Sequence, residues 1–415
     1  MLPLVKTQIQ KLKEYKGIIS DKLFGEVERL SKNFKGLKVN LVNSTPRGGG
    51  VAEILKSLVP LMKGVGIEAE WYTIPPREDF FKITKEIHNA LQGKEYAFPF
   101  WHRVRYLQHI EKIAFLMKNM KADIWVIHDS QPASVILYLP NFHPSICHLH
   151  IDLTSPNPEA WNFFVGSFRM YDKIILTSKE FIKKEIKEKT MIFPPAIDPL
   201  MEKNQPLELE KARRILESFG IDVKKPLISQ ISRFDPWKDP LGVIEAYRLA
   251  KKKIPNLQLA LVGLFLARDD PEAMKIFKRV EREVRGMPDI FLFSNPDQIG
   301  SLKVDTFVNA FQVVSDVILQ KSIREGFGMT VAEAMWKGKA VIGGNVGGIK
   351  LQIENGKNGF LVSNSKEAAK RIVQLIKNPQ LVEKLGEAAR ETAREKFLMP
   401  RLLRDYLKLF KEVIK

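Results

Sequence analysis

Cysteine is almost absent from this chain of 415 residues, in which Cys147 is the single one. One cysteine can form neither an intramolecular disulfide nor a Cys-built zinc site, and it suits a reducing compartment. The first thirty residues carry regularly spaced charges and no apolar core of signal-peptide length. The apolar runs are also shorter than the roughly 20 residues that a membrane helix needs. We therefore expect a soluble, cytoplasmic protein without integral membrane contact.

The chain has fewer acidic than basic residues. It contains 66 Lys and Arg residues and 48 Asp and Glu residues, which gives a net charge of +18. Such a surface raises the local concentration of anions, so nucleic acid, acidic lipid and phosphorylated substrates are all permitted partners. The basic residues are spread over many helices, and neither zinc-finger spacing nor an aromatic RNA-binding signature occurs. We therefore expect no nucleic-acid partner. The oligomeric state stays open, with a homodimer as one alternative.

The hydrophobic pattern alternates short apolar runs with amphipathic segments, which is typical of parallel strands joined by helices. The expected strands are 37–42, 69–74, 124–128, 145–151, 174–177 and 190–193, and then 227–232, 257–262, 290–293, 317–320, 340–343 and 359–362. The clearest helices between them are 51–64, 104–120 and 158–170. The pattern predicts the α/β class, with two Rossmann-like βα domains in tandem.

Four prolines in the segment 193–206 stiffen the chain and remove backbone donors, so we place the domain boundary near Asp198. The first domain then spans residues 1–198 and the second spans 199–399. Pro400 interrupts a long helical run just before a last amphipathic stretch, 402–414. We expect the segment 400–415 to pack back on the first domain.

The segment Glu325–Glu333 follows an expected strand and opens a helix. Glycine at Gly328 lets the backbone turn sharply, while Met329 and Thr330 stand at the helix N-terminus, where free amides and the helix dipole attract phosphate. The two carboxylates, eight positions apart, bracket this turn. Glu333 is a candidate for a ribose diol and Glu325 for a sugar hydroxyl.

Two cations, Arg233 and Lys238, lie in the loop that follows the expected strand 227–232. In an open α/β sheet, the loops at the carboxyl ends of the strands line the ligand crevice, so this pair should meet the Glu325 loop. A planar guanidinium and a compact ammonium together suit a pyrophosphate whose charge grows as a bond breaks.

In the first domain, a glycine loop that contains Gly49 and Gly50 follows the first strand and offers flexible backbone donors for phosphate or sugar oxygens. His128 and Asp129 end another expected strand, and His148 and His150 end a third. The last two share one face of a strand without a clear third ligand, so we expect a hydrogen-bonding role rather than a zinc site.

These motifs, in this order, resemble the retaining glycosyltransferases of family 4, which have the GT-B fold of two Rossmann-like domains facing each other across a cleft. More narrowly, four segments look like the trehalose glycosyltransferring synthases, which join a nucleotide-diphosphate glucose to free glucose. These segments are Gly49–Leu55, Val126–Pro132, Cys147–Asp152 and Ala267–Glu272. After Gly263 the chain reads Leu-Phe-Leu-Ala, where relatives carry a second glycine or small polar residues, so the preference among UDP, ADP and GDP donors stays open.

The resemblance implies a role for each matching residue. Arg233 and Lys238 would bind the donor diphosphate, and the Met329 and Thr330 amides its distal phosphate. Glu333 would bind the ribose and Glu325 the donor glucose. Gly49 and Gly50 would close over the donor, and His150 would lie beside the anomeric centre.

No carboxylate nucleophile is identifiable, which favours a front-face substitution in which the departing phosphate takes the proton of the acceptor hydroxyl. Fixed cations and helix amides would neutralise the diphosphate, so we expect no cofactor and no metal. Two enzymatic alternatives stay open: a nucleotide-sugar 2-epimerase of the same shape, and a family 4 transferase with a lipid or another sugar as acceptor. The lipid alternative depends on Phe98, Phe100 and Trp101, which stand beside basic residues.

Overall fold

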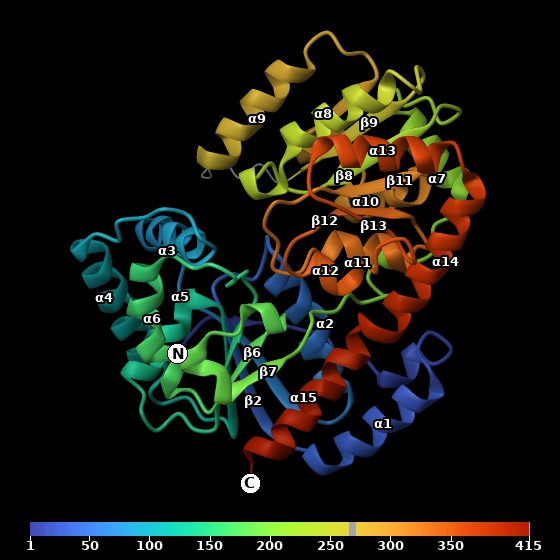
Figure 1. The fold of residues 1–415 in the computed structure, drawn as a ribbon. Helices are drawn as coiled ribbons and strands as arrows, with labels where there is room; N and C mark the ends of the chain where they lie inside the picture. Colours follow the sequence, from blue (N-terminus) through green and yellow to red (C-terminus); the bar gives the residue numbers. More distant parts are fainter. Residues whose placement is uncertain (265–270, 415) are drawn as a thin grey trace. The chain divides into compact units, whose positions relative to one another are not determined.

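The computed structural model describes residues 1–264 and 271–414, and the chain divides into two compact units. Unit 1 comprises Met1–Ala196 with Leu398–Lys415, and unit 2 comprises Ile197–Phe397. Each unit combines one sheet with helices, as Figure 1 shows. The α/β class predicted from the hydrophobic pattern is confirmed. The division after Ala196 falls in the proline-rich segment that contains the expected boundary at Asp198.

Unit 1 contains a seven-stranded sheet in the order β1-β3-β2-β4-β5-β6-β7. β1 pairs antiparallel with β3, and every other neighbouring pair is parallel. The strands are β1 (Leu4–Val5), β2 (Lys38–Asn43), β3 (Glu68–Thr73), β4 (Ile124–His128), β5 (Ser145–Leu149), β6 (Lys173–Leu176) and β7 (Thr190–Ile192). The sequence pattern predicted all of them except β1, which is too short to show a period. The strand order reverses between β2 and β4, where ligand crevices form in such sheets.

Six helices that join these strands, and one from the end of the chain, complete unit 1. They are α1 (Asp21–Ser31), α2 (Gly50–Gly64), α3 (Glu78–Leu91), α4 (Phe100–Met117), α5 (Ser130–Ala133), α6 (Pro158–Met170) and α15 (Met399–Val413). The 3₁₀ turns of unit 1 are Leu12–Tyr15, Lys32–Phe34, Ser134–Leu137, Lys179–Phe181 and Lys184–Lys189. The predicted bounds of α6 are exact because Asn157 caps it and Pro158 occupies its first position.

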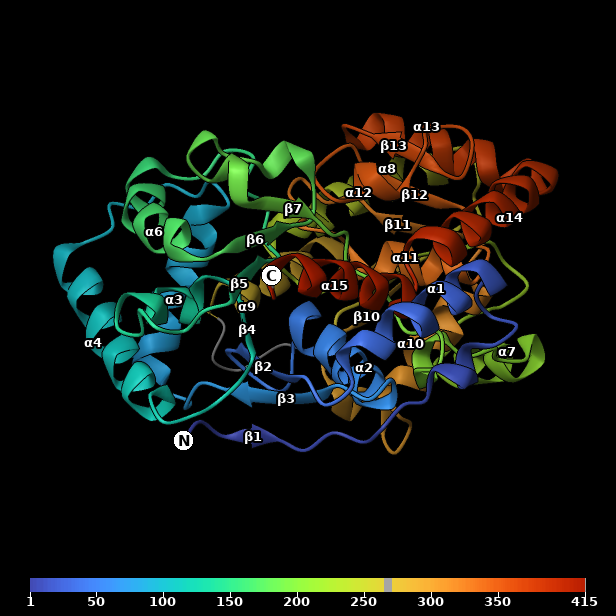
Figure 2. The same cartoon turned by 90° about the horizontal axis from the view of Figure 1, so that it is seen from below.

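The C-terminal helix α15 packs against α1 and α2 within unit 1 (Figure 2). Pro400 stands in its first turn, where a missing N–H costs nothing, so this proline starts the helix. The buried rings of Tyr406 and Phe410 face the core. The Arg401 guanidinium donates to the carbonyls of Pro194 and Pro195, at 2.6 and 2.9 Å. These bonds attach α15 to the end of the segment Met1–Ala196.

Unit 2 contains a six-stranded parallel sheet in the order β10-β9-β8-β11-β12-β13. The strands are β8 (Leu227–Ile231), β9 (Gln258–Val262), β10 (Ile290–Phe293), β11 (Val317–Gln320), β12 (Val341–Gly344) and β13 (Phe360–Val362). This is the Rossmann order 3-2-1-4-5-6, which reverses between β8 and β11. The loops after these two strands therefore border the crevice where such sheets bind ligands.

The helices of unit 2 are α7 (Leu209–Glu217), α8 (Pro240–Lys251), α9 (Pro271–Val284), α10 (Val304–Val314), α11 (Met329–Trp336), α12 (Ile349–Gln352), α13 (Ser365–Ile376) and α14 (Pro379–Lys396). Its 3₁₀ turns are Glu202–Asn204, Pro236–Lys238 and Pro296–Ile299. Among the described helices of both units, none is long and apolar enough to cross a membrane.

Candidate active site

The loops after β8 and β11 bring together a predicted cation and a predicted carboxylate. Lys238 Nζ lies 2.5 Å from Glu325 Oε2, and both side chains are largely buried. Lys238 ends the 3₁₀ turn after β8, and Glu325 follows β11, the neighbouring strand. Sequence spacing separates these residues widely, and the parallel pairing of the two strands brings them to one edge of the sheet.

The Glu325 carboxylate also accepts hydrogen bonds from neutral side chains. Ser322 Oγ donates to Oε2 at 3.0 Å, and Gln320 Nε2 lies 3.4 Å from the same oxygen. Three donors therefore converge on one oxygen, which fixes the rotamer of the carboxylate. Neither Ser322 nor Gln320 was singled out in the sequence, because a polar residue at a strand end carries no motif of its own.

Backbone and side-chain hydrogen bonds link the two loops. The Ile323 N–H donates to the Trp237 carbonyl at 2.8 Å, and Gln230 Nε2 donates to the Lys238 carbonyl at 3.0 Å. Thr330 Oγ1 donates to the Ile231 carbonyl at 3.1 Å, so the first turn of α11 is attached to the end of β8. These bonds hold the backbone at Lys238 and the N-terminus of α11 in one arrangement.

The turn before α11 depends on glycine. Gly328 is the N-cap and has a φ of +86°, in the left-handed region that favours glycine. Gly348 is packed so closely that a Cβ would stand 2.3 Å from the Gly326 carbonyl oxygen. The N–H groups of Met329 and Thr330 follow in the first turn of the helix, where no preceding helical carbonyl is available to them. The predicted turn and helix start are therefore present, and phosphate binding there stays a prediction.

Arg233 lies in the same loop as Lys238, but its guanidinium is 55% exposed and pairs with Asp235 at 3.1 Å. The pair is local, since the two residues are two positions apart. The side chain is thus free of the buried network around Glu325 and is available to an anion that approaches from solvent.

Glu333 occupies a different environment from Glu325. Its carboxylate is 3% exposed, lies 2.6 Å from Lys203 Nζ and accepts a hydrogen bond from Gln312 Nε2 at 3.1 Å. Burial by itself raises the pKa of this carboxyl, but the charges of Lys203 and Lys337 outweigh it and hold the pKa below its usual value. Glu333 is therefore an ionised, buried group that already neutralises a lysine. The partner Lys203 comes from the start of unit 2, and sequence reasoning missed it because no motif marks it.

In unit 1, the glycine loop follows β2 as predicted, and α2 begins at Gly50 with Gly49 as its N-cap. Gly48 and Gly49 have φ angles of +72° and +154°, which L side chains rarely adopt. The Asn43 side chain bridges the loop, since it donates to the Thr45 carbonyl at 2.8 Å and accepts from Trp71 Nε1 at 2.7 Å. The loop is thus anchored at its strand end and open at its glycines.

Three histidines cluster at the same edge of the unit 1 sheet, after the neighbouring strands β4 and β5. His128 Nδ1 lies 3.0 Å from His150 Nε2, and the rings of His148 and His150 stack with centroids 3.8 Å apart. His148 Nδ1 lies 2.6 Å from the Tyr406 hydroxyl of α15. One ligand atom from each imidazole can be chosen so that all lie within 4.8 Å of one another. The sequence argument that no third ligand accompanies His148 and His150 was wrong, because His128 stands beside them across the strand pair.

The three imidazoles are neutral at physiological pH. Burial lowers the pKa of His150 to about 3 and, together with the neighbouring imidazoles, lowers the pKa values of His128 and His148 well below the usual range. Each ring also keeps one buried nitrogen without a hydrogen-bond partner, namely His128 Nε2, His148 Nε2 and His150 Nδ1. His150 is the most exposed residue of the three. The cluster can therefore offer neutral donors or acceptors to a polar ligand, but not a proton donor at neutral pH.

Asp129 positions His150. Asp129 Oδ1 accepts the His150 backbone N–H at 2.7 Å, and the Asp129 backbone adopts a φ of +64°. Burial raises the pKa of this carboxyl to about 7, against the effect of that hydrogen bond. Cys147, the residue before His148, is fully buried, which confirms its predicted place in the strand core.

Two further sequence features have separate outcomes. Of the aromatic residues considered for a lipid surface, Phe98 is buried, whereas Phe100 and Trp101 at the start of α4 are exposed. In the Ala267–Glu272 motif, residues 267–270 lie outside the residues that the structure describes.

Comparison with known proteins agrees with this architecture. Residues 41–183 match the family model of the trehalose synthase N-terminal domain, and residues 211–392 match that of glycosyl transferases group 1. A trehalose synthase from Pyrococcus horikoshii is 43% identical over 401 residues, which cover 96% of this chain and 95% of that protein. Another, from Rubrobacter xylanophilus, is 40% identical over 420 residues and the full length of both chains.

The fold is also found among solved structures. Anabaena Alr3699/HepE in complex with UDP-glucose has a TM-score of 0.66 at 19% identity, over 91% of this chain and all of that one. The two α/β units with largely parallel sheets and the matched family models define a glycosyltransferase with the GT-B fold. Within that class, the chain belongs to the trehalose synthase family. Its activity is therefore that of a trehalose-related glycosyltransferase.

Proposed function

We propose that this chain transfers glucose from a nucleotide-diphosphate glucose to free glucose, with retention of configuration, and so forms trehalose. The proposal rests on one observation above all. Lys238, Glu325 and the N-terminus of α11 are fixed together at the carboxyl ends of β8 and β11, where the sheet order reverses. A cation, a carboxylate and free amides in one place suit a sugar attached to a diphosphate.

Unit 2 would hold the donor. The Lys238 ammonium has three donors, of which Glu325 uses one, so phosphate oxygens can share the same cation. Exposed Arg233 would supply a bidentate fork, and the amides of Met329 and Thr330 would receive the distal phosphate. The fixed Glu325 carboxylate would accept hydrogen bonds from glucose hydroxyls. That the relative Anabaena Alr3699/HepE was solved with UDP-glucose supports a donor of this class.

Unit 1 would hold the acceptor, Gly49 and Gly50 would close over the donor, and His150 would lie beside the anomeric centre. Because the His150 imidazole is neutral, it would serve as a hydrogen-bonding group near the anomeric carbon rather than as a general acid. Its buried Nδ1, which has no partner, would accept a hydrogen bond from a sugar hydroxyl.

In a front-face substitution, the bond between the anomeric carbon and the phosphate oxygen breaks as the bond to the acceptor oxygen forms on the same face. The proton of the acceptor hydroxyl passes to the departing phosphate, so the products are trehalose and a nucleoside diphosphate. Lys238, Arg233 and the helix amides would stabilise the charge that develops on the leaving group, without a covalent intermediate or a metal.

The test is incubation of the full chain with UDP-, ADP- or GDP-glucose and glucose, with the product linkage read by NMR. We expect an α,α-1,1-linked disaccharide that forms only when the acceptor is present. The rates with the three donors give the preference for the nucleotide base. The Arg233→Ala variant should lose about 10²-fold in kcat, as the loss of one charge stabiliser does. Its matched control is Arg213→Ala, which removes an exposed arginine paired with Glu210.

Three outcomes would overturn the proposal. Conversion of the nucleotide sugar without any acceptor would indicate an epimerase. Transfer to a lipid but not to glucose would assign the exposed Phe100 and Trp101 to a membrane surface. Equal rates for Arg233→Ala and Arg213→Ala would remove the diphosphate from the β8 loop.

A further inference from the structure

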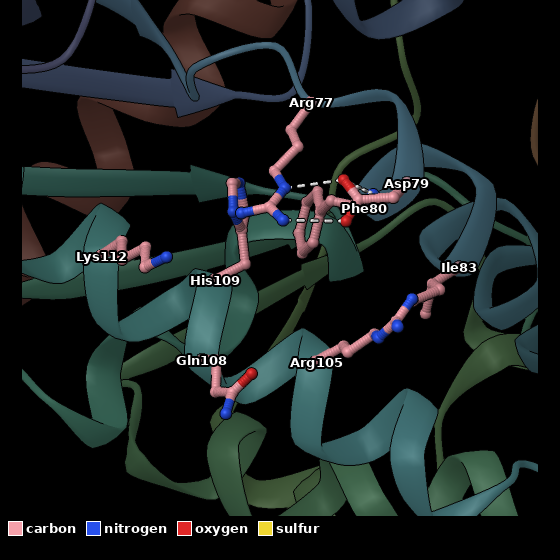
Figure 3. A pocket seen from close by; sticks show the side chains of 8 residues that line it. All are labelled: Arg77, Asp79, Phe80, Ile83, Arg105, Gln108, His109 and Lys112. Carbon is pink, nitrogen blue, oxygen red and sulfur yellow. Dashed lines mark hydrogen bonds and ion pairs between the residues drawn. The ribbon is translucent and has the colours of Figure 1, made fainter.

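Unit 1 contains a cavity of about 210 Å³ that the proposed reaction does not use. It is bordered by the first turn of α3 and the middle of α4, and Figure 3 shows its lining. The lining residues are Arg77, Asp79, Phe80, Ile83, Arg105, Gln108, His109 and Lys112. Four of these eight carry a basic group and only one is acidic.

The charges around the cavity do not cancel. Arg77 and Asp79 neutralise each other through a two-bond ion pair, at 2.7 and 3.0 Å. Arg105 lies over the Trp101 ring, with the guanidinium carbon 5.0 Å from its centroid, and that contact leaves the charge in place. Within the described residues, neither Arg105 nor Lys112 forms an ion pair. The cavity therefore has an excess of positive charge, which attracts an anion.

His109 provides a second, independent observation. The residue is 8% exposed, and both of its ring nitrogens are buried without a hydrogen-bond partner. Its ring packs against Phe80 with centroids 4.1 Å apart. In Figure 3 the Arg77 guanidinium lies beside this ring, and Lys112 extends toward it from α4. Buried polar atoms without a hydrogen-bond partner are rare and costly in folded proteins. A bound ligand would supply the partner that these two ring nitrogens lack.

We propose that this cavity binds a phosphate group, carried either by inorganic phosphate or by the phosphomonoester of a sugar. Tetrahedral phosphate oxygens can accept the guanidinium fork of an arginine and the ammonium of a lysine at once. The imidazole of His109 supplies a further hydrogen-bond donor to the phosphate. The apolar faces of Phe80 and Ile83 give a surface for the C–H groups of a sugar ring. The site consists of unit 1 residues only and is independent of the proposed donor site on Arg233 and Lys238.

Phosphate in the cavity would change the protonation of His109. Burial, and then the charges of Arg77 and Lys112, lower the pKa of this imidazole, while Asp79 opposes them. A dianion beside the ring reverses that balance, because it stabilises the imidazolium. Binding should therefore raise the pKa of His109 and take up a proton.

The experiment measures binding of inorganic phosphate and of glucose 6-phosphate to the full chain by titration calorimetry, at constant ionic strength, with acetate and chloride as comparison anions. It is carried out in the Arg233→Ala background, so that the proposed donor site contributes less. Substitution of Arg105 or Lys112 by alanine should weaken binding about tenfold each, the loss expected for one charge-assisted contact. Both side chains are exposed, so the fold should survive.

The matched control is Lys118→Ala, which removes an exposed lysine at the C-terminal end of α4, outside the cavity lining. It should bind phosphate as the parent chain does. NMR titration of the seven histidines shows where the phosphate binds. The resonance that is missing from the spectrum of His109→Gln is that of His109. The pKa obtained from this resonance should rise when phosphate is added.

Equal affinity for the two ligands would show that the cavity recognises the phosphate group alone. Tighter binding of glucose 6-phosphate would show that it recognises a sugar phosphomonoester. Either result supports the site. The proposal fails if acetate binds as tightly as phosphate, if Arg105→Ala and Lys112→Ala bind like Lys118→Ala, or if the His109 resonance does not respond.

Discussion

Lys238 and Glu325 form an ion pair of 2.5 Å between the loops that follow two adjacent parallel strands. The pair makes the proposed donor site a single electrostatic unit, because each group fixes the orientation of the other. It also connects stability with activity, since the same two side chains would meet the diphosphate and the sugar.

A double-mutant cycle should reveal this coupling. Lys238→Met leaves the Glu325 carboxylate largely buried with only Ser322 and Gln320 as donors, so it should destabilise the chain by about 1–3 kcal/mol. Glu325→Gln should cost a similar amount. The double variant should lose clearly less than the sum of the two, as measured by urea unfolding. Strict additivity would mean that the two groups do not interact in solution.

The buried pair of Glu333 and Lys203 should give a different pattern. Glu333→Gln removes the carboxylate that neutralises Lys203, so we expect a stability loss of about 3–5 kcal/mol. Lys203→Met combined with Glu333→Gln should recover part of that loss. If Glu333 also binds the donor ribose, the KM for the donor should stay raised in this stabilised double variant. A normal KM there would limit Glu333 to a structural role.

Removal of metal ions should leave the reaction unchanged, because fixed cations and helix amides are proposed to neutralise the diphosphate. The measurement is the rate of disaccharide formation after dialysis against excess EDTA. Loss of activity with rescue by Mg²⁺ or Mn²⁺ would place a metal on the diphosphate. Rescue by Zn²⁺ would point instead to the cluster of His128, His148 and His150, whose imidazoles are close enough to share an ion.

The raised pKa of Asp129 predicts a pH-dependent difference in stability. Between the unfolded pKa of about 4 and the folded value of about 7, the folded chain binds more protons at this carboxyl than the unfolded chain. The contribution of Asp129 is therefore fully present below pH 4 and is lost as the pH rises through 7. Asp129→Asn keeps an acceptor for the His150 N–H and tolerates the left-handed backbone.

The thermal midpoint of Asp129→Asn should accordingly match that of the parent chain near pH 4 and exceed it at pH 8, by an amount equivalent to on the order of 2–4 kcal/mol. The buried histidines titrate in both chains, so the difference between the chains isolates the carboxyl. A difference that does not change between pH 4 and pH 8 would show that Asp129 titrates normally.

Much of the fold could be predicted because its signals are local. Apolar runs of strand length marked every strand but β1, and Pro158 and Pro400 marked helix starts because proline fits in the first turn of a helix. Glycines with positive φ, such as Gly328, marked the turn before α11. These features depend only on the residue and its neighbours in the chain.

The pairings within the site are the part that only the tertiary structure decided. The sequence predicted that Lys238 would meet the Glu325 loop, and the structure shows that the two side chains form an ion pair. The sequence gave Glu333 no partner, and the fold placed Lys203 beside it. It marked His128, His148 and His150 at strand ends, and the pairing of β4 with β5 brought His128 into contact with His150. The cationic cavity around His109 had no recognised motif, because one face of α4 meets the start of α3 only in the folded chain. Local conformational preferences depend on neighbouring residues in the chain. Burial and charge neutralisation depend instead on which distant strands and helices the packing of the core brings together.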